Sequence, residues 1–294
     1  MATGSVMRQM RCLKQRLRSP QSGATLIEMV IVIVISALIA GGVAVFISRP
    51  FEGYIDAARR AELSDVADTA LRRMTRDLRS ALPNSIRITC VPAGCTDEMT
   101  RVYYLEYLQT RGGGRYRSDK DSAGNGDELL FNTTDNSFDV VGPPVFLESG
   151  DSIVIYNLAS SGTVANAYSD NTTNNRSSVS SPFGTVNNIS ISSKQFPYPS
   201  PGKRFHILEH PVTYECNPTT GELRRHWGYP IAPTQTPLPP TGGSVALLAN
   251  AITRCSFTYN TTSERTSVVG VAVRVERNGE FVRLFQQVHV SNAP

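Results

Sequence analysis

A single carboxylate stands inside a long apolar segment near the N-terminus of this 294-residue chain. From Ala24 to Ser48 the only charged residue is Glu28. A charge inside a membrane-length segment is costly, so it is usually retained for a function and usually has a partner. If the chain is cut after Gly23, a new α-amine appears at Ala24, four residues before the acid. A carboxylate and a freed amino terminus could then pair between the subunits of a filament.

The segment that must position this acid is long enough to cross a membrane as a helix. Residues 24–48 would span about 37 Å at 1.5 Å per residue, against a hydrocarbon core of about 30 Å. A secretory signal peptide would instead be cut after the apolar run, near residues 40–44, and a signal anchor would not be cut at all. Both alternatives leave Glu28 without a role, so a cut after Gly23 is favoured.

The sequence Gly-Ala-Thr-Leu-Ile-Glu-Met-Val at residues 23–30 resembles the class III leader of type IV prepilins and type II secretion pseudopilins. The resemblance is close over residues 22–82 and extends to the rest of the chain only in general layout. Within the family it is greatest to the minor prepilins of the mannose-sensitive haemagglutinin (MSHA) pilus and to the J-type minor pseudopilins. The family usually has Phe after the scissile glycine, where this chain has Ala24.

The resemblance implies a processed and assembled protein that needs no cofactor. A prepilin peptidase would remove residues 1–23 by cutting after Gly23 and would methylate the amine of Ala24, and Glu28 would act in assembly. The helix over 24–48 would contact membrane lipid, an inner-membrane assembly platform and homologous pilin subunits.

The same resemblance implies a location and a choice of functions. The protein would first span the inner membrane once, with a cytoplasmic leader and a periplasmic head, and then lie in a pilus at the cell surface. We expect a minor pilin that serves pilus assembly, initiation or the tip and so supports surface adhesion. The alternatives are a minor pseudopilin that serves protein export and a tip adhesin whose head binds a ligand.

The charge distribution agrees with a cytoplasmic leader. Subtracting the leader's five basic residues from the 29 of the chain leaves 24 against 25 acids, a net charge near −1 after cleavage. An excess of positive charge on the cytoplasmic side is the usual pattern in membrane proteins. Beyond the leader, the sequence has no basic stripe with interleaved aromatic residues, so we expect no nucleic-acid partner.

Four of the five cysteines lie beyond the apolar segment, where an oxidising compartment would allow disulfide bonds. They are Cys90, Cys95, Cys216 and Cys255, and four cysteines permit three pairings. A local Cys90–Cys95 bond with a distant Cys216–Cys255 bond is favoured, and free thiols are the alternative. A zinc site is disfavoured because the chain lacks a second close cysteine pair and a suitably spaced histidine.

The sequence after the apolar run predicts an α+β, pilin-like fold, in which a long N-terminal helix packs on an antiparallel sheet. Apolar residues at steps of three and four continue the helix as an amphipathic segment over residues 49–82, and Pro83-Asn84 ends it. The apolar stripe is expected to pack on the chain's own sheet rather than to form a groove for a partner. Residues 83–294 are expected to form a β-rich head.

The strongest strand signal in the head is a hairpin formed by Ser267–Glu276 and Glu280–Val290. Asn278-Gly279 between them favours a type I′ turn, and the helix is expected to pack on this hairpin as a central element. Alternation and β-forming residues predict further strands over 85–90, 101–108, 129–131, 138–141, 152–156, 186–192, 212–216, 223–227 and 255–259. Composition predicts loops over 111–127, 160–181 and 230–243, the second of them exposed and mobile.

No enzyme active site is expected. The four histidines are scattered, and Gly112–Gly114 is not followed by the helix start that a phosphate-binding loop needs. The oxygen ligands of residues 119–127 could hold calcium, although their spacing differs from that of an EF-hand, and a solvated loop is favoured. Five aromatic residues could line a sugar-binding face but are more readily placed in the sheet core: Tyr103, Tyr104, Tyr107, Trp227 and Tyr229.

Overall fold

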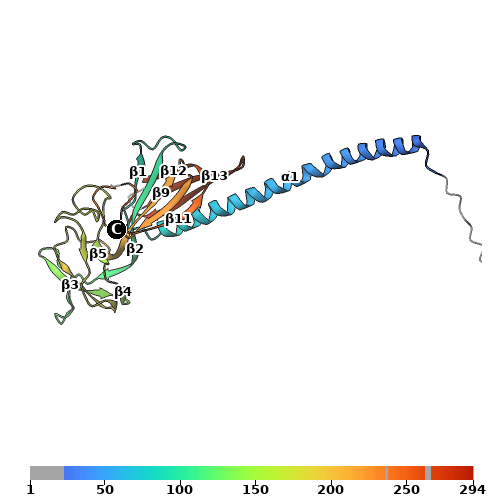
Figure 1. Ribbon diagram of the computed structural model, residues 1–294. Helices are drawn as coiled ribbons and strands as arrows, with labels where there is room; N and C mark the ends of the chain where they lie inside the picture. Colours follow the sequence, from blue (N-terminus) through green and yellow to red (C-terminus); the bar gives the residue numbers. More distant parts are fainter. Residues whose placement is uncertain (1–22, 236–237, 262–265, 294) are drawn as a thin grey trace, which may run out of the picture. The chain divides into compact units, whose positions relative to one another are not determined.

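The computed structural model describes residues 23–235, 238–261 and 266–293, which contain one α-helix and fourteen β-strands (Figure 1). The α+β, pilin-like layout is confirmed, because an apolar N-terminal helix is followed by a head of antiparallel sheets. The chain divides into two compact units between Ile55 and Asp56. The strands are β1 (Arg87–Val91), β2 (Val102–Tyr116), β3 (Asp135–Val141), β4 (Val145–Leu147), β5 (Ser152–Ile155), β6 (Arg176–Ser178), β7 (Gly184–Val186), β8 (Asn188–Lys194), β9 (Arg204–Asn217), β10 (Glu222–Trp227), β11 (Ser244–Asn250), β12 (Ile252–Thr261), β13 (Thr266–Arg277) and β14 (Glu280–Ser291).

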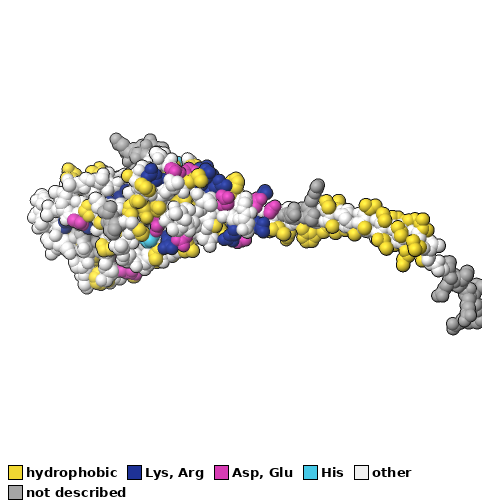
Figure 2. All heavy atoms as spheres, turned by 45° about the horizontal axis from the view of Figure 1, so that its top comes forward, with side chains coloured by type: hydrophobic (Ala, Val, Ile, Leu, Met, Phe, Trp, Pro, Cys, Tyr) yellow, Lys and Arg dark blue, Asp and Glu magenta, His cyan; other side chains and the backbone are white. Residues whose placement is uncertain are grey.

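Helix α1 (Leu26–Leu78) belongs to both units, and its two parts have different surfaces. In the first unit, apolar side chains are exposed on all sides of the helix, and Figure 2 shows them as an almost continuous surface. In the second unit, one stripe of the helix is buried, and most of its charged residues lie on the exposed sides. The buried residues follow steps of three and four: Leu63, Ala67, Ala70, Leu71, Met74 and Leu78.

The stripe of α1 packs on the chain's own strands, as the sequence indicated. Met74 shares one core cluster with Tyr214 of β9 and with Val271 of β13, so the helix covers parts of two sheets. The helix was expected to reach Leu82 but ends at Leu78. The chain leaves the helix early because Ala81 forms a β-bridge with Gln109 of β2.

The described residues of the head form three antiparallel sheets. The largest has the order β11-β10-β9-β2-β3-β8, with β1 paired to β2 and with β5 paired to both β9 and β6. A second sheet has the order β12-β13-β14, and β4 pairs with β7. Strands β2 and β9 are the longest pair in the large sheet and run together from Tyr103↔Cys216 to Arg115↔Arg204.

The predicted C-terminal hairpin is confirmed as β13 and β14. Asn278 and Gly279 have φ values of 53° and 84°. Positive φ angles at both central residues are what a type I′ turn needs. The expectation that the hairpin is central was wrong in one respect. Within the sheet of described strands, β13 is the middle strand and β14 is an edge, because no described strand pairs with the outer side of β14.

The prediction of a loop over residues 111–127 was wrong for residues 111–116. Residues 111–116 continue β2, although they include three consecutive glycines, because β9 lies alongside and pairs with them. The close pairing requires glycine at Gly113, because an added Cβ there would clash with the carbonyl oxygen of Phe205. Tertiary pairing therefore overrides the low strand propensity of glycine.

Two further expectations need correction. Residues 129–131 form no strand, because Leu130 N–H is taken by the side chain of Asp135 at 2.8 Å. The segment 160–181 was expected to be an exposed loop, but it contains β6 and fully buried residues such as Tyr168. Side-chain amides hold this segment against neighbouring strands. For example, the Asn175 amide donates to the carbonyl of Ile155 on β5 at 3.0 Å.

Candidate functional site

The residues expected to be processed lie at the start of α1. Gly23 and Ala24 precede the helix, and Glu28 lies exposed in its first turn. The hydroxyl of Thr25 accepts a hydrogen bond from the backbone N–H of Glu28 at 3.3 Å, and the Thr25 carbonyl accepts one from Met29. Thr25 is therefore the N-cap of the helix, and Glu28 occupies the third helical position.

This geometry gives Glu28 a local role that we did not expect. The spacing Thr25-x-x-Glu28 is that of a capping box, and a carboxylate in the first turn is favourable at the positive end of the helix dipole. The spacing was visible in the sequence and could have revealed the cap. Within the described residues, the carboxylate of Glu28 forms no ion pair.

The helix that follows is the one described segment long and apolar enough to cross a membrane. The span Leu26–Ile47 has 22 residues, none of them buried inside the structure. At 1.5 Å per residue it reaches about 33 Å, which matches a hydrocarbon core of about 30 Å. An exposed apolar surface of this size marks a site of contact with a membrane or with another protein.

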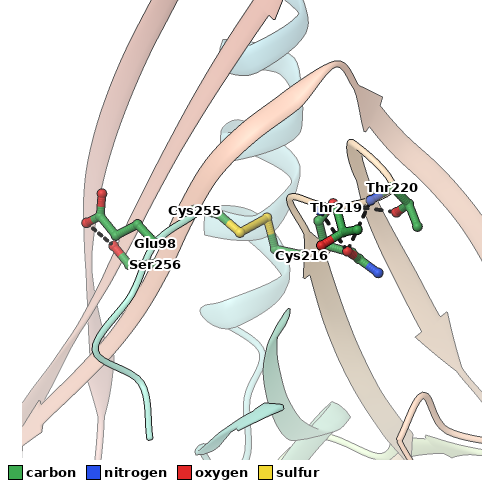
Figure 3. The surroundings of a disulfide bond; sticks show 7 residues. Glu98, Cys216, Thr219, Thr220, Cys255 and Ser256 are labelled. Carbon is green, nitrogen blue, oxygen red and sulfur yellow. Dashed lines mark hydrogen bonds between the residues drawn. A yellow bond between two sulfur atoms is a disulfide. The ribbon is translucent and has the colours of Figure 1, made fainter. Parts of the chain in front are cut away.

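Two disulfide bonds stabilise the head. Cys90 pairs with Cys95, and Cys216 pairs with Cys255, with Cα–Cα distances of 5.4 and 6.4 Å. These are the pairs that the sequence analysis favoured. The second bond links β9 of the large sheet to β12 of the three-stranded sheet (Figure 3). Beside it, the backbone and side chain of Glu98 bind Cys255 N–H and the Ser256 hydroxyl.

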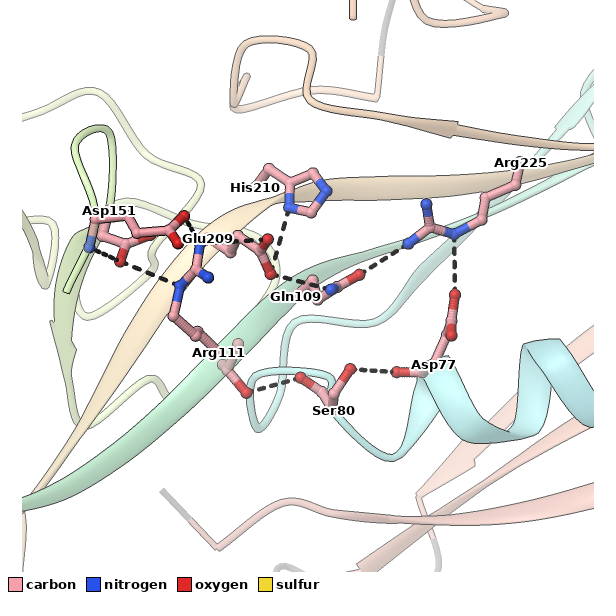
Figure 4. Close-up of polar contacts among 10 residues, drawn as sticks. Asp77, Ser80, Gln109, Arg111, Asp151, Glu209, His210 and Arg225 are labelled. Atoms are coloured by element: carbon pink, nitrogen blue, oxygen red, sulfur yellow. Dashed lines mark hydrogen bonds and ion pairs between the residues drawn. The ribbon is translucent and has the colours of Figure 1, made fainter. Parts of the chain in front are cut away.

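A buried charge network fastens the last turn of α1 to the large sheet (Figure 4). The Asp77 carboxylate is 8% exposed and lies 2.9 Å from Nε of Arg225 on β10. It also accepts a hydrogen bond from the Tyr214 hydroxyl at 2.8 Å, and Arg73 Nε lies 3.1 Å away. Burial and the charge of Asp77 raise the pKa of the Tyr214 hydroxyl, so this group remains a donor.

The network continues along β2 and β9. Arg225 also donates to Gln109, and Gln109 donates to Glu209 at 3.1 Å. Arg111 then lies within 3.4 Å of Glu209 and 2.7 Å of Glu148. Each of these charged side chains lies beside one of opposite charge, so the network connects α1 to strands of the large sheet.

The other candidate residues are not brought together. His206 and His210 lie on β9, His226 bonds Glu215 at 2.8 Å, and His289 is exposed on β14. Asp119 pairs with Lys203, and the Asp121 carboxylate accepts N–H groups of its own loop. Over the described residues, no group of three or more His, Cys, Asp or Glu is arranged to hold a metal ion. The tyrosines considered for a sugar-binding face are buried.

Comparison with known proteins identifies the N-terminal motif. The family model described as the prokaryotic N-terminal methylation motif matches residues 18–44. Neither the curated proteins nor the solved structures compared with this chain include a match. The motif, together with the apolar helix that it largely covers, supports a type IV pilin-like class III leader and is consistent with a membrane-anchored protein. In general terms they support a type IV pilin or pseudopilin.

Proposed function

We propose that this protein is a minor subunit of a type IV pilus of the MSHA type, comparable to the minor pilin MshO. It would act in pilus assembly, initiation or at the tip, and so support adhesion to surfaces. One observation carries the proposal: a methylation motif over 18–44 covers most of an exposed, membrane-length helix with a single acid.

The proposed mechanism begins with processing. The basic leader stays in the cytoplasm, a prepilin peptidase cuts after Gly23, and the new Ala24 amine is methylated. The mature helix waits in the inner membrane until the assembly platform extracts it. At about 0.8 kcal/mol per CH₂ group, exposing this segment to water would cost tens of kcal/mol, so neighbouring pilin helices must cover it. Filament cohesion then comes mainly from residues 24–48.

Glu28 would set the axial register of the subunit. Its carboxylate would neutralise the Ala24 ammonium of an adjacent subunit inside the helical bundle. A buried ion pair contributes more to selecting one arrangement than to net stability, because both charges must be desolvated.

Mass spectrometry of the protein purified from cells tests the processing step. The expected mature protein begins at an N-methylated Ala24. A protein that still begins at Met1, or one that begins beyond Val45, would contradict the proposal.

Substitution of Glu28 by Leu tests the assembly step. The Glu28→Leu protein should still insert in the membrane, because a charge is removed from the apolar segment, but its incorporation into pili should fall severalfold or more. Met29→Leu is the matched control and should assemble normally. Thr25→Ala separates the two roles of Glu28. If Thr25→Ala reduced incorporation as strongly as Glu28→Leu, helix capping and not pairing would explain the effect.

The same motif would serve a minor pseudopilin of type II secretion. Deletion of the gene distinguishes the two systems. Loss of surface pili with normal protein export supports the pilus assignment, and loss of export with normal pili supports the pseudopilus assignment.

A further inference from the structure

An open groove lies over β2 and β9, beyond the part of these strands that α1 covers. Its volume is about 320 Å³, and it is lined by Gly113, Gly114, Arg115, Arg204, Phe205 and His206. The antiparallel register places Arg115 directly opposite Arg204, and Gly113 opposite His206. Residues two apart on a strand share a face, so the two arginines and the histidine lie on one face of the sheet.

The two arginines are unusual among the basic residues of this region. Both are exposed, and neither forms an ion pair with any residue that the structure describes. Their sequence neighbours are paired, Arg117 with Asp139 and Lys203 with Asp119. Like charges that face each other directly across two strands destabilise a sheet. A bound anion would remove this repulsion.

The floor and wall of the groove are suited to a ligand. Gly113 exposes bare backbone, and no other residue fits there because a Cβ would clash with Phe205. The His206 ring borders the same space, since its Nδ1 lies 3.5 Å from where that Cβ would be. Its Nε2 is buried and has no hydrogen-bond partner among the described residues.

We infer that this groove binds a carboxylate or sulfate group of an acidic polysaccharide. Guanidinium groups bind such oxyanions in a planar, two-pronged manner, and Arg115 and Arg204 both line this groove. The volume is several times the roughly 30 Å³ of one water and reaches the about 300 Å³ at which pockets for small organic ligands begin. The groove therefore has room for the sugar that carries the anion.

An extended acidic peptide fits less well. Such a peptide usually adds a strand to a free sheet edge. The outer edge of β2 is occupied on both sides of the groove, because Thr110 N–H bonds the carbonyl of Ser80 and Arg115 pairs with Val141. Only four residues remain free between them, fewer than an ordinary strand of five or six. The inference concerns the head alone and does not depend on processing or on the type of pilus.

The test measures binding of the full chain, purified in detergent, to dextran sulfate, carboxymethyl dextran and unmodified dextran at fixed ionic strength. Dextran sulfate or carboxymethyl dextran should bind, and unmodified dextran should not. Arg115→Gln and Arg204→Gln should each weaken binding about tenfold, the loss of one charge-assisted contact. Arg224→Gln is the control: it removes the same charge from a half-buried residue of β10 that pairs with Glu222 and lies outside the groove.

Thermal unfolding shows whether the variants fold. Removing one of two facing arginines should leave the melting temperature unchanged or raise it. Equal weakening by Arg224→Gln would show nonspecific charge attraction and overturn the inference. Tighter binding of poly-glutamate or of duplex DNA than of either charged dextran would assign the groove to another class of ligand. An affinity for free sodium sulfate equal to that for dextran sulfate would show that the groove does not recognise the sugar and would overturn the inference.

Discussion

His206 shows how its place in a sheet changes the chemistry of one side chain. Burial, and secondarily the positive charge of Arg204, lower the pKa of this imidazole from 6.5 to about 4. The folded protein therefore keeps His206 neutral down to mildly acidic pH, whereas the unfolded chain takes up a proton near pH 6.5. Between these values the unfolded state binds more protons, so the free energy of unfolding falls as the pH falls through this window.

His206→Gln should remove part of this pH dependence. From pH 7 to pH 5, the wild-type chain should lose roughly 2 kcal/mol more free energy of unfolding than the variant, given a pKa near 4 when folded and 6.5 when unfolded. Urea unfolding followed by the fluorescence of Trp227, the only tryptophan in the chain, measures it.

Controls for this prediction come from the same chain. His289→Gln, the same substitution at an exposed position on β14, is the matched control. Burial raises the pKa of Glu106, which makes its contribution oppose that of His206, so only the difference between matched variants is informative. Identical pH profiles for wild type and His206→Gln would contradict the assignment.

At the scale of one element, α1 carries two aspartates with similar partners and different surroundings. Asp68 pairs with Arg72 on the exposed side of the helix, one turn away. Asp77 pairs with Arg225 of β10 in the interior and also binds Tyr214. An exposed pair in water contributes little, whereas removing one partner of a buried pair leaves a charge without compensation. The helix is therefore attached to the sheet at its last turn.

Asp77→Asn should lower the free energy of unfolding by about 3–5 kcal/mol, because Arg225 would remain buried without a counter-charge. Asp68→Asn, the same change on the same helix, should cost less than about 1 kcal/mol. Urea unfolding monitored by Trp227 fluorescence compares the two. Equal losses of unfolding free energy for the two variants would mean that the Asp77 network does not stabilise the fold more than an exposed ion pair does.

At the scale of the second compact unit, the nine-stranded and the three-stranded sheets are joined by a shared hydrophobic cluster and by a disulfide bond. The Cys216–Cys255 disulfide crosses between β9 and β12 and closes a loop of 39 residues. The Cys90–Cys95 bond closes a loop of five residues at the end of β1. In the chain-entropy description, a cross-link stabilises the folded state more when the loop is longer.

The double substitution Cys216→Ala with Cys255→Ala should lower the free energy of unfolding by about 4 kcal/mol. The corresponding change at Cys90 and Cys95 should cost about 2 kcal/mol, since its loop is much shorter. Both are measured by urea unfolding under oxidising conditions. A larger loss for the short loop would show that local packing, and not chain entropy, dominates.

The sequence by itself determined the features that depend on local pattern. Neighbouring residues alone predict three features: the 22-residue apolar helix, the acid at Glu28 and the turn at Asn278-Gly279. The amphipathic stripe of α1 follows for the same reason, because helical periodicity places its apolar residues on one face. The capping pair of Thr25 and Glu28 was equally local and could have been predicted.

Only the tertiary structure decided the features that depend on residues far apart in the chain. The glycines of β2 adopt a strand conformation because β9 pairs with them. The edge strand β11 consists mostly of exposed residues, so its sequence has no alternation of buried and exposed residues that would predict a strand. The same is true of the contact between Asp77 and Arg225 and of the Arg115–Arg204 groove. Strand order and register set these neighbours, and a local window of sequence does not contain either one.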